Sequence, residues 1–350
     1  MNKQTSKSIG WRSPSNIALV KYWGKHGDQL PNNPSISFTL SNAFTETIIQ
    51  YAPLDYNQDI INTNFYFDGK PNEAFQLRID SFINKHIAAF DYLRNVQLNI
   101  ESRNSFPHSS GIASSASSMS ALVLCLLSIE KELKGERSDL MRQASHLSRL
   151  ASGSASRSVI PYVALWGDCS IAGSSDEYAI PLSNVDSVFK GFHDDILIVS
   201  ADEKAVSSSA GHQLMNDNPY AESRYGRAHK HVLETEAHLM DGNIEALGEI
   251  IENEALELHA LMMCSRPAYI LMEANTLAII SAIRRFRKEN NKPIFFTLDA
   301  GPNVHVLYPD EIKNEAETFI NESLLPLCVD NRIIKDRVGD GPSTITEFSI

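Results

Sequence analysis

The sequence predicts a compact chain that mixes helices and strands, and two observations carry this prediction. The 350 residues are 43 % hydrophobic and 21 % charged, with 17 glycines and 15 prolines. This composition is typical of packed globular proteins and excludes disordered, collagen-like and disulfide-scaffold classes. Strand-like patterns also dominate the first hundred residues, and helix-like patterns follow them. The length allows a sizeable core and two lobes.

The predicted strands of the first hundred residues are short runs rich in β-branched and aromatic residues. They cover residues 36–40, 45–51, 64–67 and 96–100. Asp68 and Gly69 follow the third run and predict a tight turn there, because Asp-Gly accommodates positive φ angles. This part of the chain therefore supplies a sheet.

Helical patterns begin after residue 112. Residues 113–133 are rich in Ala, Leu and Met, and residues 140–150 form a second helical stretch. The second half opens with a predicted strand at 195–200. It continues with helices at 220–240, 244–263 and 268–288, and with strands at 294–299 and 304–308. The change of pattern predicts one lobe over residues 1–190 and another over 191–350.

Charge and cysteine usage limit the classes of partner. The formal net charge is -12, which argues against a broad nucleic-acid or anionic-membrane surface, so a phosphate-bearing ligand needs a local pocket of donors. The cysteines, at positions 125, 169, 264 and 328, show no C-x-x-C spacing, as expected in a reducing compartment. The N-terminus has no signal-like apolar segment and no apolar run is long enough to span a bilayer. We expect a cytoplasmic protein.

A loop of small residues precedes the first long helix. In residues 107–116 the chain reads Pro-His-Ser-Ser-Gly-Ile-Ala-Ser-Ser-Ala. Small residues let a phosphate approach the backbone, and the free N–H groups of a helix start attract anions. The expected phosphate-binding residues are Ser109, Ser110, Gly111, Ile112, Ala113, Ser114 and Ser115. The Ser115 hydroxyl is also a candidate ligand for Mg²⁺. Ordinary helix capping by these serines is the alternative.

This loop resembles the second motif of the GHMP small-molecule kinases, and three further segments narrow the resemblance to the diphosphomevalonate decarboxylase family. Residues 15–25 (SNIALVKYWGK) with 31–37 (PNNPSIS) are similar to the family's N-terminal motif. Residues 149–158 (RLASGSASRS) and 297–303 (TLDAGPN) resemble two others in the same order. A weaker resemblance occurs at 206–212 and another at 339–342.

The resemblance implies an α+β GHMP kinase fold, with an N-terminal lobe like ribosomal protein S5 domain 2 and a ferredoxin-like C-terminal lobe. It also implies a cleft between the lobes and a homodimer. The implied activity is ATP- and Mg²⁺-dependent decarboxylation of (R)-5-diphosphomevalonate to isopentenyl diphosphate, ADP, phosphate and CO₂. That reaction proceeds through phosphorylation of the 3-hydroxyl and belongs to the mevalonate pathway of isoprenoid, lipid and sterol precursor biosynthesis.

The resemblance also assigns residue roles. Asp299 would accept or orient the proton of the substrate hydroxyl, Lys21 would contact Asp299 or the transferring phosphate, and Arg157 would hold the substrate carboxylate with its planar fork. The other implied substrate-binding residues are Tyr22, Lys25, Ser152, Ser154 and Ser208. Three of these residues have a plainer alternative: Asp299 as a turn aspartate before Gly-Pro, Arg157 as a solvated surface arginine, and Lys25 as a surface lysine.

The chain departs from the family pattern at several positions, namely Pro34, Ala151, Ser156, Pro161, Tyr162, Ala210 and His212. Three other functions therefore stay open: a decarboxylase of the 5-monophosphate, a mevalonate 3-kinase, and a GHMP-fold binding protein without turnover. The lone histidines, including His108 and His259, are expected to be structural, because no H-x-x-x-H pair indicates a metal site.

Overall fold

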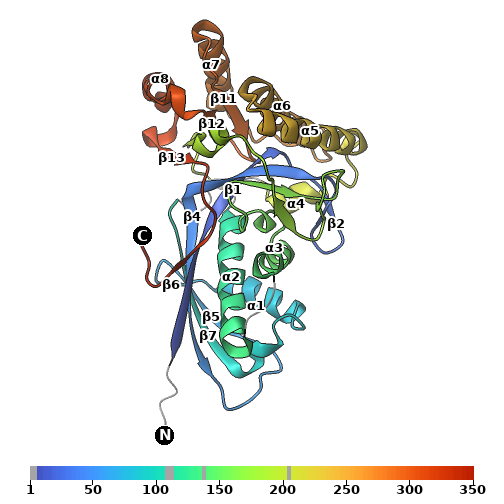
Figure 1. The fold of residues 1–350 in the computed structure, drawn as a ribbon, viewed down its shortest axis with the longest axis vertical. Coiled ribbons are helices and arrows are strands. Elements are labelled where there is room, and N and C mark those ends of the chain that lie inside the picture. Colours follow the sequence, from blue (N-terminus) through green and yellow to red (C-terminus); the bar gives the residue numbers. More distant parts are fainter. Residues whose placement is uncertain (1–5, 107–113, 136–138, 203–205) are drawn as a thin grey trace.

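The computed structural model describes residues 6–106, 114–135, 139–202 and 206–350. Two sheets dominate it, one of eight strands and one of four, and β2 (Lys25–His26) and β3 (Leu30–Pro31) pair as a short ribbon. The molecule is elongated (Figure 1): the eight-stranded sheet with α1, α2 and α3 occupies one end, and the four-stranded sheet with α5 to α8 the other. The mixed fold predicted from the sequence is confirmed.

The eight-stranded sheet is built on two long antiparallel strands, β1 (Lys7–Val20) and β4 (Ser35–Pro53). Its order is β14-β1-β4-β7-β5-β6, and β8 pairs with β4 and with β9. The remaining bounds are β5 Thr63–Phe67, β6 Lys70–Pro71, β7 Val96–Asn104, β8 Val163–Trp166, β9 Ala179–Pro181 and β14 Ser343–Ile345. The predicted turn at Asp68 and Gly69 joins β5 to β6, with positive φ at both residues.

The predicted strands 36–40 and 45–51 are one strand, β4, so the prediction of two was wrong. Ser41 and Asn42 interrupt the hydrophobic pattern because both are exposed. The carboxylate of Asp336 accepts hydrogen bonds from the N–H groups of Ser41, Asn42 and Ala43 at 2.6–2.8 Å. A partner distant in sequence thus satisfies the polar backbone at this interruption.

Three helices pack on the eight-stranded sheet: α1 (Glu73–Lys85), α2 (Ser114–Lys134) and α3 (Leu140–Ala151). The central helix, α2, lies against β1 and β4, and its middle, from Met119 to Leu127, is buried. The last two helices agree with the predictions at 113–133 and 140–150. Helix α1 was not predicted; of its residues only Ile79, Phe82 and Ile83 are buried, which gives a weak periodic signal.

The four-stranded sheet has the order β11-β12-β10-β13, all antiparallel. Its strands are β10 His193–Leu197, β11 Phe295–Leu298, β12 Val304–Tyr308 and β13 Ile333–Arg337. The helices of this half are α4 Ser208–Gln213, α5 Ala221–Asp241, α6 Ile244–Met263, α7 Ala274–Asn290 and α8 Lys313–Phe319. Strand β10 therefore ends three residues before the predicted end at 200.

The start of α7 differs from the predicted residue 268. The helix begins at Ala274 because Glu273 and Thr276 form a reciprocal capping box, in which each side chain bonds the other's backbone N–H. The end of the chain then returns to the first sheet: β14 pairs with β1, and Leu40 bridges Val338. Among the described residues, no helix combines the length and apolar character that a membrane crossing requires.

Candidate active site

A cavity of about 330 Å³ lies where the two halves of the molecule meet. Its wall contains nine of the residues singled out from the sequence: Lys21, Tyr22, Lys25, Ser115, Ser152, Ser154, Arg157, Ser208 and Asp299. Ser114 is the first residue of α2 but is not in the wall. Ser109, Ser110, Gly111, Ile112 and Ala113, and also His108, lie outside the described residues. Segments up to 278 positions apart therefore converge on one cavity.

Lys21 and Tyr22 both face the cavity because β1 ends at Val20. Adjacent residues of a continuing strand would point to opposite sides of the sheet. Here the chain leaves the strand immediately before Lys21, so both side chains reach the same space. Burial raises the pKa of the Tyr22 hydroxyl, which is a neutral group at physiological pH.

The ammonium of Lys21 lies beside the carboxylate of Asp299, with 3.7 Å between Nζ and Oδ1. Asp299 follows β11 and is about one quarter exposed. Lys21 is 1 % exposed, and its Nζ donates a 2.6 Å hydrogen bond to the carbonyl of Ala18. Burial lowers the pKa of Lys21, and the Asp299 charge opposes that shift. The pair joins a buried cation to a carboxylate that is open to the cavity.

The guanidinium of Arg157 is buried and held by two neutral groups. Nε donates to the Asn16 side-chain oxygen at 3.1 Å, and Nη1 donates to the Ser35 hydroxyl at 2.7 Å. Within the described part of the chain Nη2 has no hydrogen-bond partner. Burial lowers the pKa of Arg157 to about 10, so it stays charged near neutral pH. Arg157 is a fixed cation with a free donor, not a solvated surface charge.

The cavity wall is strongly cationic although the whole chain is acidic. It contains four basic side chains, those of Lys21, Lys25, Arg78 and Arg157, against the one carboxylate of Asp299 among the described residues. Lys25 is half-buried and donates to Gln29 at 2.9 Å; burial, and then the Arg78 charge, lower its pKa. Such a wall suits a ligand that carries several negative charges.

Arg78 was missed by the sequence analysis. It comes from α1, a helix that was not predicted, and it belongs to none of the four motifs. A lone arginine on an amphipathic helix carries no signal of a binding role. Only the packing of α1 beside the cavity brings it to the site.

His212 also lies in the wall, stacked between two aromatic rings. Its ring centroid is 4.4 Å from that of Tyr22 and 4.5 Å from that of Trp23. The Gly24 N–H donates to its Nδ1 at 2.9 Å, so the neutral ring carries its proton on Nε2. Burial, with Lys25 and Arg157 nearby, lowers the pKa of His212 to about 3. The position that departs from the family pattern therefore holds an uncharged imidazole.

Two serines of the site meet at the first turn of α2. Ser152 Oγ lies 3.3 Å from Ser115 Oγ, and Asn16 donates to the carbonyl of Ser154 at 3.1 Å. Hydroxyl oxygens are hard ligands of the kind that Mg²⁺ accepts, and the N–H groups of a helix start attract phosphate. The hydroxyls at this end of the cavity could thus hold a phosphate or a magnesium ion.

His259 does not enter the cavity. It is 1 % exposed, and its Nε2 lies 3.1 Å from the main-chain carbonyl of Asp299, to which it donates. This bond agrees with the expected structural role, because it fixes the backbone of Asp299, which lines the cavity.

Two sequence profiles match the chain. That of the diphosphomevalonate decarboxylase-like N-terminal domain matches residues 13–179. That of the mevalonate 5-diphosphate decarboxylase C-terminal domain matches residues 195–337. A phosphomevalonate decarboxylase of Haloferax volcanii is 26 % identical over 86 % of this chain and 88 % of its own length.

Solved structures of the same family are also similar to this chain. The mevalonate diphosphate decarboxylase of Staphylococcus aureus is 30 % identical, with a TM-score of 0.80 over 97 % of this chain and 98 % of that one. MDDEF, solved in complex with MVAPP, AMPPCP and magnesium, is 27 % identical, with a TM-score of 0.81 over 97 % and 99 %. The two profiles and the solved structures together show that the chain belongs to the mevalonate diphosphate decarboxylase family, with its GHMP kinase fold.

Proposed function

We propose that the chain catalyses the ATP-dependent decarboxylation of (R)-5-diphosphomevalonate to isopentenyl diphosphate, a step of isoprenoid precursor synthesis. One observation carries the proposal: Lys21, Arg157 and Asp299, from three distant segments, meet in a single cationic cavity with Nζ of Lys21 3.7 Å from Asp299. The relatives named above act on phosphorylated mevalonate.

Asp299 is proposed to activate the substrate. A tertiary alcohol is a poor nucleophile, so its 3-hydroxyl needs a carboxylate that accepts or orients its proton during attack on the γ-phosphorus of ATP. Among the described residues, Asp299 supplies the carboxylate of the cavity wall, and the Lys21 ammonium lies 3.7 Å from it. The O–P bond forms as the bond to ADP breaks.

Arg157 is proposed to act in the second half of the reaction. When the C3–O bond breaks and phosphate leaves, positive charge develops at C3, and the electrons of the C–CO₂ bond then form the new double bond. Until that moment the substrate carboxylate must be held in place. The free Nη2 of Arg157, on a guanidinium fixed by Asn16 and Ser35, is suited to hold it.

The remaining roles are also proposals. Tyr22, Lys25, Ser152, Ser154 and Ser208 would bind the substrate's carboxylate and distal phosphates, and Arg78 would add a further cation there. The loop from Ser109 to Ser115 would hold ATP. Bound Mg²⁺, with Ser115 as one ligand, would neutralise the charge of the transferring phosphate.

Two features of the molecule as a whole belong to the proposal. We propose a division into lobes at 1–190 and 191–350, which is supported by the arrangement of most strands in two sheets; β14 rejoins the first sheet. A homodimer in the cytoplasm is proposed on the family resemblance. Light scattering of the purified protein tests the dimer, because a mass near that of one 38.9 kDa chain would contradict it.

The reaction is tested by measuring ADP and CO₂ release with Mg-ATP and, separately, mevalonate, its 5-phosphate and its 5-diphosphate. We expect equal amounts of ADP and CO₂ with the diphosphate only. Equal amounts with the monophosphate would show a phosphomevalonate decarboxylase, as in the Haloferax relative. ADP without CO₂ would show a 3-kinase, and no ADP with any of the three would favour a binding protein or an enzyme with an unrelated substrate.

A further inference from the structure

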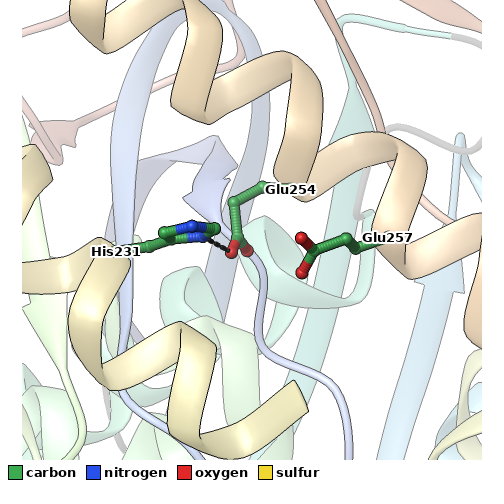
Figure 2. A group of neighbouring side chains, drawn as sticks. All are labelled: His231, Glu254 and Glu257. Atoms are coloured by element: carbon green, nitrogen blue, oxygen red, sulfur yellow. Dashed lines mark hydrogen bonds and ion pairs between the residues drawn. The ribbon is translucent and has the colours of Figure 1, made fainter. Parts of the chain in front are cut away.

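We infer that Glu254 and Arg224, which lie outside the cavity wall, are positioning residues that fix the main chain of Lys21 and so place its ammonium beside Asp299. The inference rests on the proposed function, in which Lys21 and Asp299 face the substrate. It concerns a cluster of charged side chains between α5 and α6, which comprises Arg224, His231, Glu254 and Glu257. Figure 2 shows three of these side chains pointing toward one another from the two helices.

Glu254 is the centre of this cluster and is fully buried. Its Oε2 accepts hydrogen bonds from the Lys21 N–H at 2.7 Å and from Arg224 Nη2 at 2.5 Å. Its Oε1 accepts from Arg224 Nη1 at 2.8 Å and from His231 Nδ1 at 2.5 Å. Burial opposes the carboxylate, but the charge of Arg224 and these bonds bring the pKa of Glu254 below its ordinary value. The group is therefore ionised at neutral pH.

Both polar groups of the Lys21 peptide backbone are held by this cluster. The N–H donates to Glu254, and the carbonyl accepts from Arg224 Nη2 at 3.1 Å and from Asn33 Nδ2 at 2.9 Å. Lys21 needs such partners because β1 ends at Val20, where the sheet ladder stops. Helices of the C-terminal half thus hold the backbone of a residue from the N-terminal half.

The position of the Lys21 ammonium follows from the position of its backbone. The side chain is buried, and its Nζ is bonded to the Ala18 carbonyl only three residues back. The 3.7 Å separation from Asp299 therefore depends on where the Lys21 backbone lies. A misplacement of about 1 Å at a reacting group costs roughly 100-fold in rate, so a displacement of this backbone is expected to slow turnover.

A metal ion is the other reading of this cluster, since His231, Glu254 and Glu257 bring ligand atoms within 4.8 Å of one another. The neighbouring arginines argue against it. Arg224 already donates to both oxygens of Glu254 and lies 3.5 Å from Glu257, which is also paired with Arg227. A cation added there would be repelled by both guanidinium groups. The cluster is a charge-balanced support.

The test compares two glutamates of the same helix. Glu254→Gln keeps the shape of the side chain and removes the charge that Arg224 and Lys21 use. Glu252→Gln is the matched control, because Glu252 is equally buried on α6 and is paired with Arg284 and Arg287, away from the cavity. Wild-type ADP release is measured first, so that its absence refutes the proposed function separately from this inference.

We expect Glu254→Gln to lower kcat roughly 10- to 100-fold while KM for ATP and substrate changes less than about twofold. Glu252→Gln is expected to leave both constants near wild type. A fall in melting temperature with unchanged kcat for Glu254→Gln would overturn the inference, since it would show a structural role only.

A pH titration of the Lys21 ammonium supplies a second readout. Three carboxylates, those of Asp299, Glu254 and Asp194, raise the pKa of the Lys21 ammonium, and the Arg157 charge lowers it. Arg224 contacts the main-chain carbonyl of Lys21. Removing the Glu254 charge should therefore shift the Lys21 titration to lower pH. The ¹³C chemical shift of Lys21 Cε, assigned with Lys21→Met, reports this without turnover. An unshifted titration would contradict the arrangement.

If Glu254→Gln does not fold, the double variant Arg224→Met/Glu254→Met replaces it. Exchanging both members of a buried ion pair for apolar residues of similar size commonly preserves folding. This variant removes the Glu254 and Arg224 bonds to the Lys21 backbone and leaves the Asn33 bond, while Glu257 keeps Arg227 as its partner. The same loss of kcat is expected, and wild-type kcat in the folded double variant would refute the inference.

Discussion

At the scale of single residues, the site depends on side chains whose surroundings fix their charge. Lys21 and Arg157 are both buried, and burial lowers the pKa of each. Hydrogen bonds to the Ala18 carbonyl and to Asn16 hold the two side chains in place. In contrast to Lys21 and Arg157, Asp299 has more than a quarter of its side chain exposed. The chemistry is therefore expected to be most sensitive at Asp299 and Arg157.

Asp299→Ala should leave the fold intact and reduce turnover about 10³-fold, because the group that orients the nucleophile is lost. Steady-state ADP release measures turnover, and near-UV circular dichroism checks the fold. Asp241→Ala, at an exposed position at the end of α5, is the control. Turnover near wild type in Asp299→Ala would refute the assignment.

Arg157→Lys is not a conservative change. The guanidinium uses Nε for Asn16 and Nη1 for Ser35 while Nη2 remains for the cavity, and an ammonium cannot reproduce that fork. A loss of about 100-fold in kcat is expected, as for removal of one oriented donor. The CO₂ release rate is the measurement, with Arg142→Lys on the exposed face of α3 as control. Equal rates in wild type and Arg157→Lys would contradict the role.

His212 should make the protein sensitive to mild acid. Its pKa is about 3 in the fold against 6.5 for an ordinary histidine, so the unfolded chain binds the extra proton first and stability is lost as pH falls below 6.5. By pH 5 this amounts to about 2 kcal/mol. His212→Phe keeps a ring between Tyr22 and Trp23 and should lose less stability between pH 7.5 and pH 5 than wild type does. Urea unfolding at both pH values decides, and equal losses would refute the prediction.

At the scale of elements, close approach between helix and strand shapes the C-terminal half. Helix α6 lies against β11 at Gly248, where an added Cβ would come within 2.2 Å of the Phe295 ring. The helix also carries Leu258, in the cavity wall, and Glu254, on the Lys21 backbone. The seating of α6 on the sheet thus contributes to the geometry of the site.

Two glycine substitutions separate helix propensity from packing. Gly226 in α5 has no atom within 4 Å of an added Cβ, so Gly226→Ala should stabilise the protein by up to about 1 kcal/mol. Gly248→Ala gains the same propensity but overlaps Phe295, and it should destabilise by roughly 1–3 kcal/mol. Thermal unfolding of the two variants measures this. A rise in melting temperature for both would show that α6 moves freely on the sheet.

At the scale of the whole molecule, contacts between the two halves complete the site. Glu254 and Arg224 hold Lys21 across the boundary, and Asp336 of β13 holds the middle of β4. The last strand, β14, also returns to the edge of the first sheet beside β1. The two halves are therefore expected to unfold together.

Asp336→Ala tests this coupling. The change leaves the N–H groups of Ser41, Asn42 and Ala43 without their partner and should cost on the order of 3 kcal/mol. Asp336→Asn keeps an oxygen for two of the three and should cost less. Urea unfolding followed by tryptophan fluorescence and by circular dichroism gives the measurement. An unchanged midpoint for Asp336→Ala would show that the two halves are coupled elsewhere.

Much of this protein could be predicted from local patterns. Helix α6 and strand β12 were predicted with the bounds observed, because α6 has a helical spacing of apolar residues and β12 is a short run bounded by Asn303 and Pro309. Eight of the nine predicted site residues in the cavity wall come from the four motifs, since each motif combines reactive side chains with the small residues that a ligand requires.

The tertiary structure decided the rest. Arg78 has no motif around it, and the contacts of Glu254 with Lys21 join residues 233 positions apart. The continuity of β4 through exposed Ser41 and Asn42 depends on a carboxylate from the far end of the chain. The sequence by itself determined the local elements, the family and the reactive residues, because propensity and motif chemistry are short-range. Only folding determined their distances and ionisation, because burial and the charges of distant segments set both.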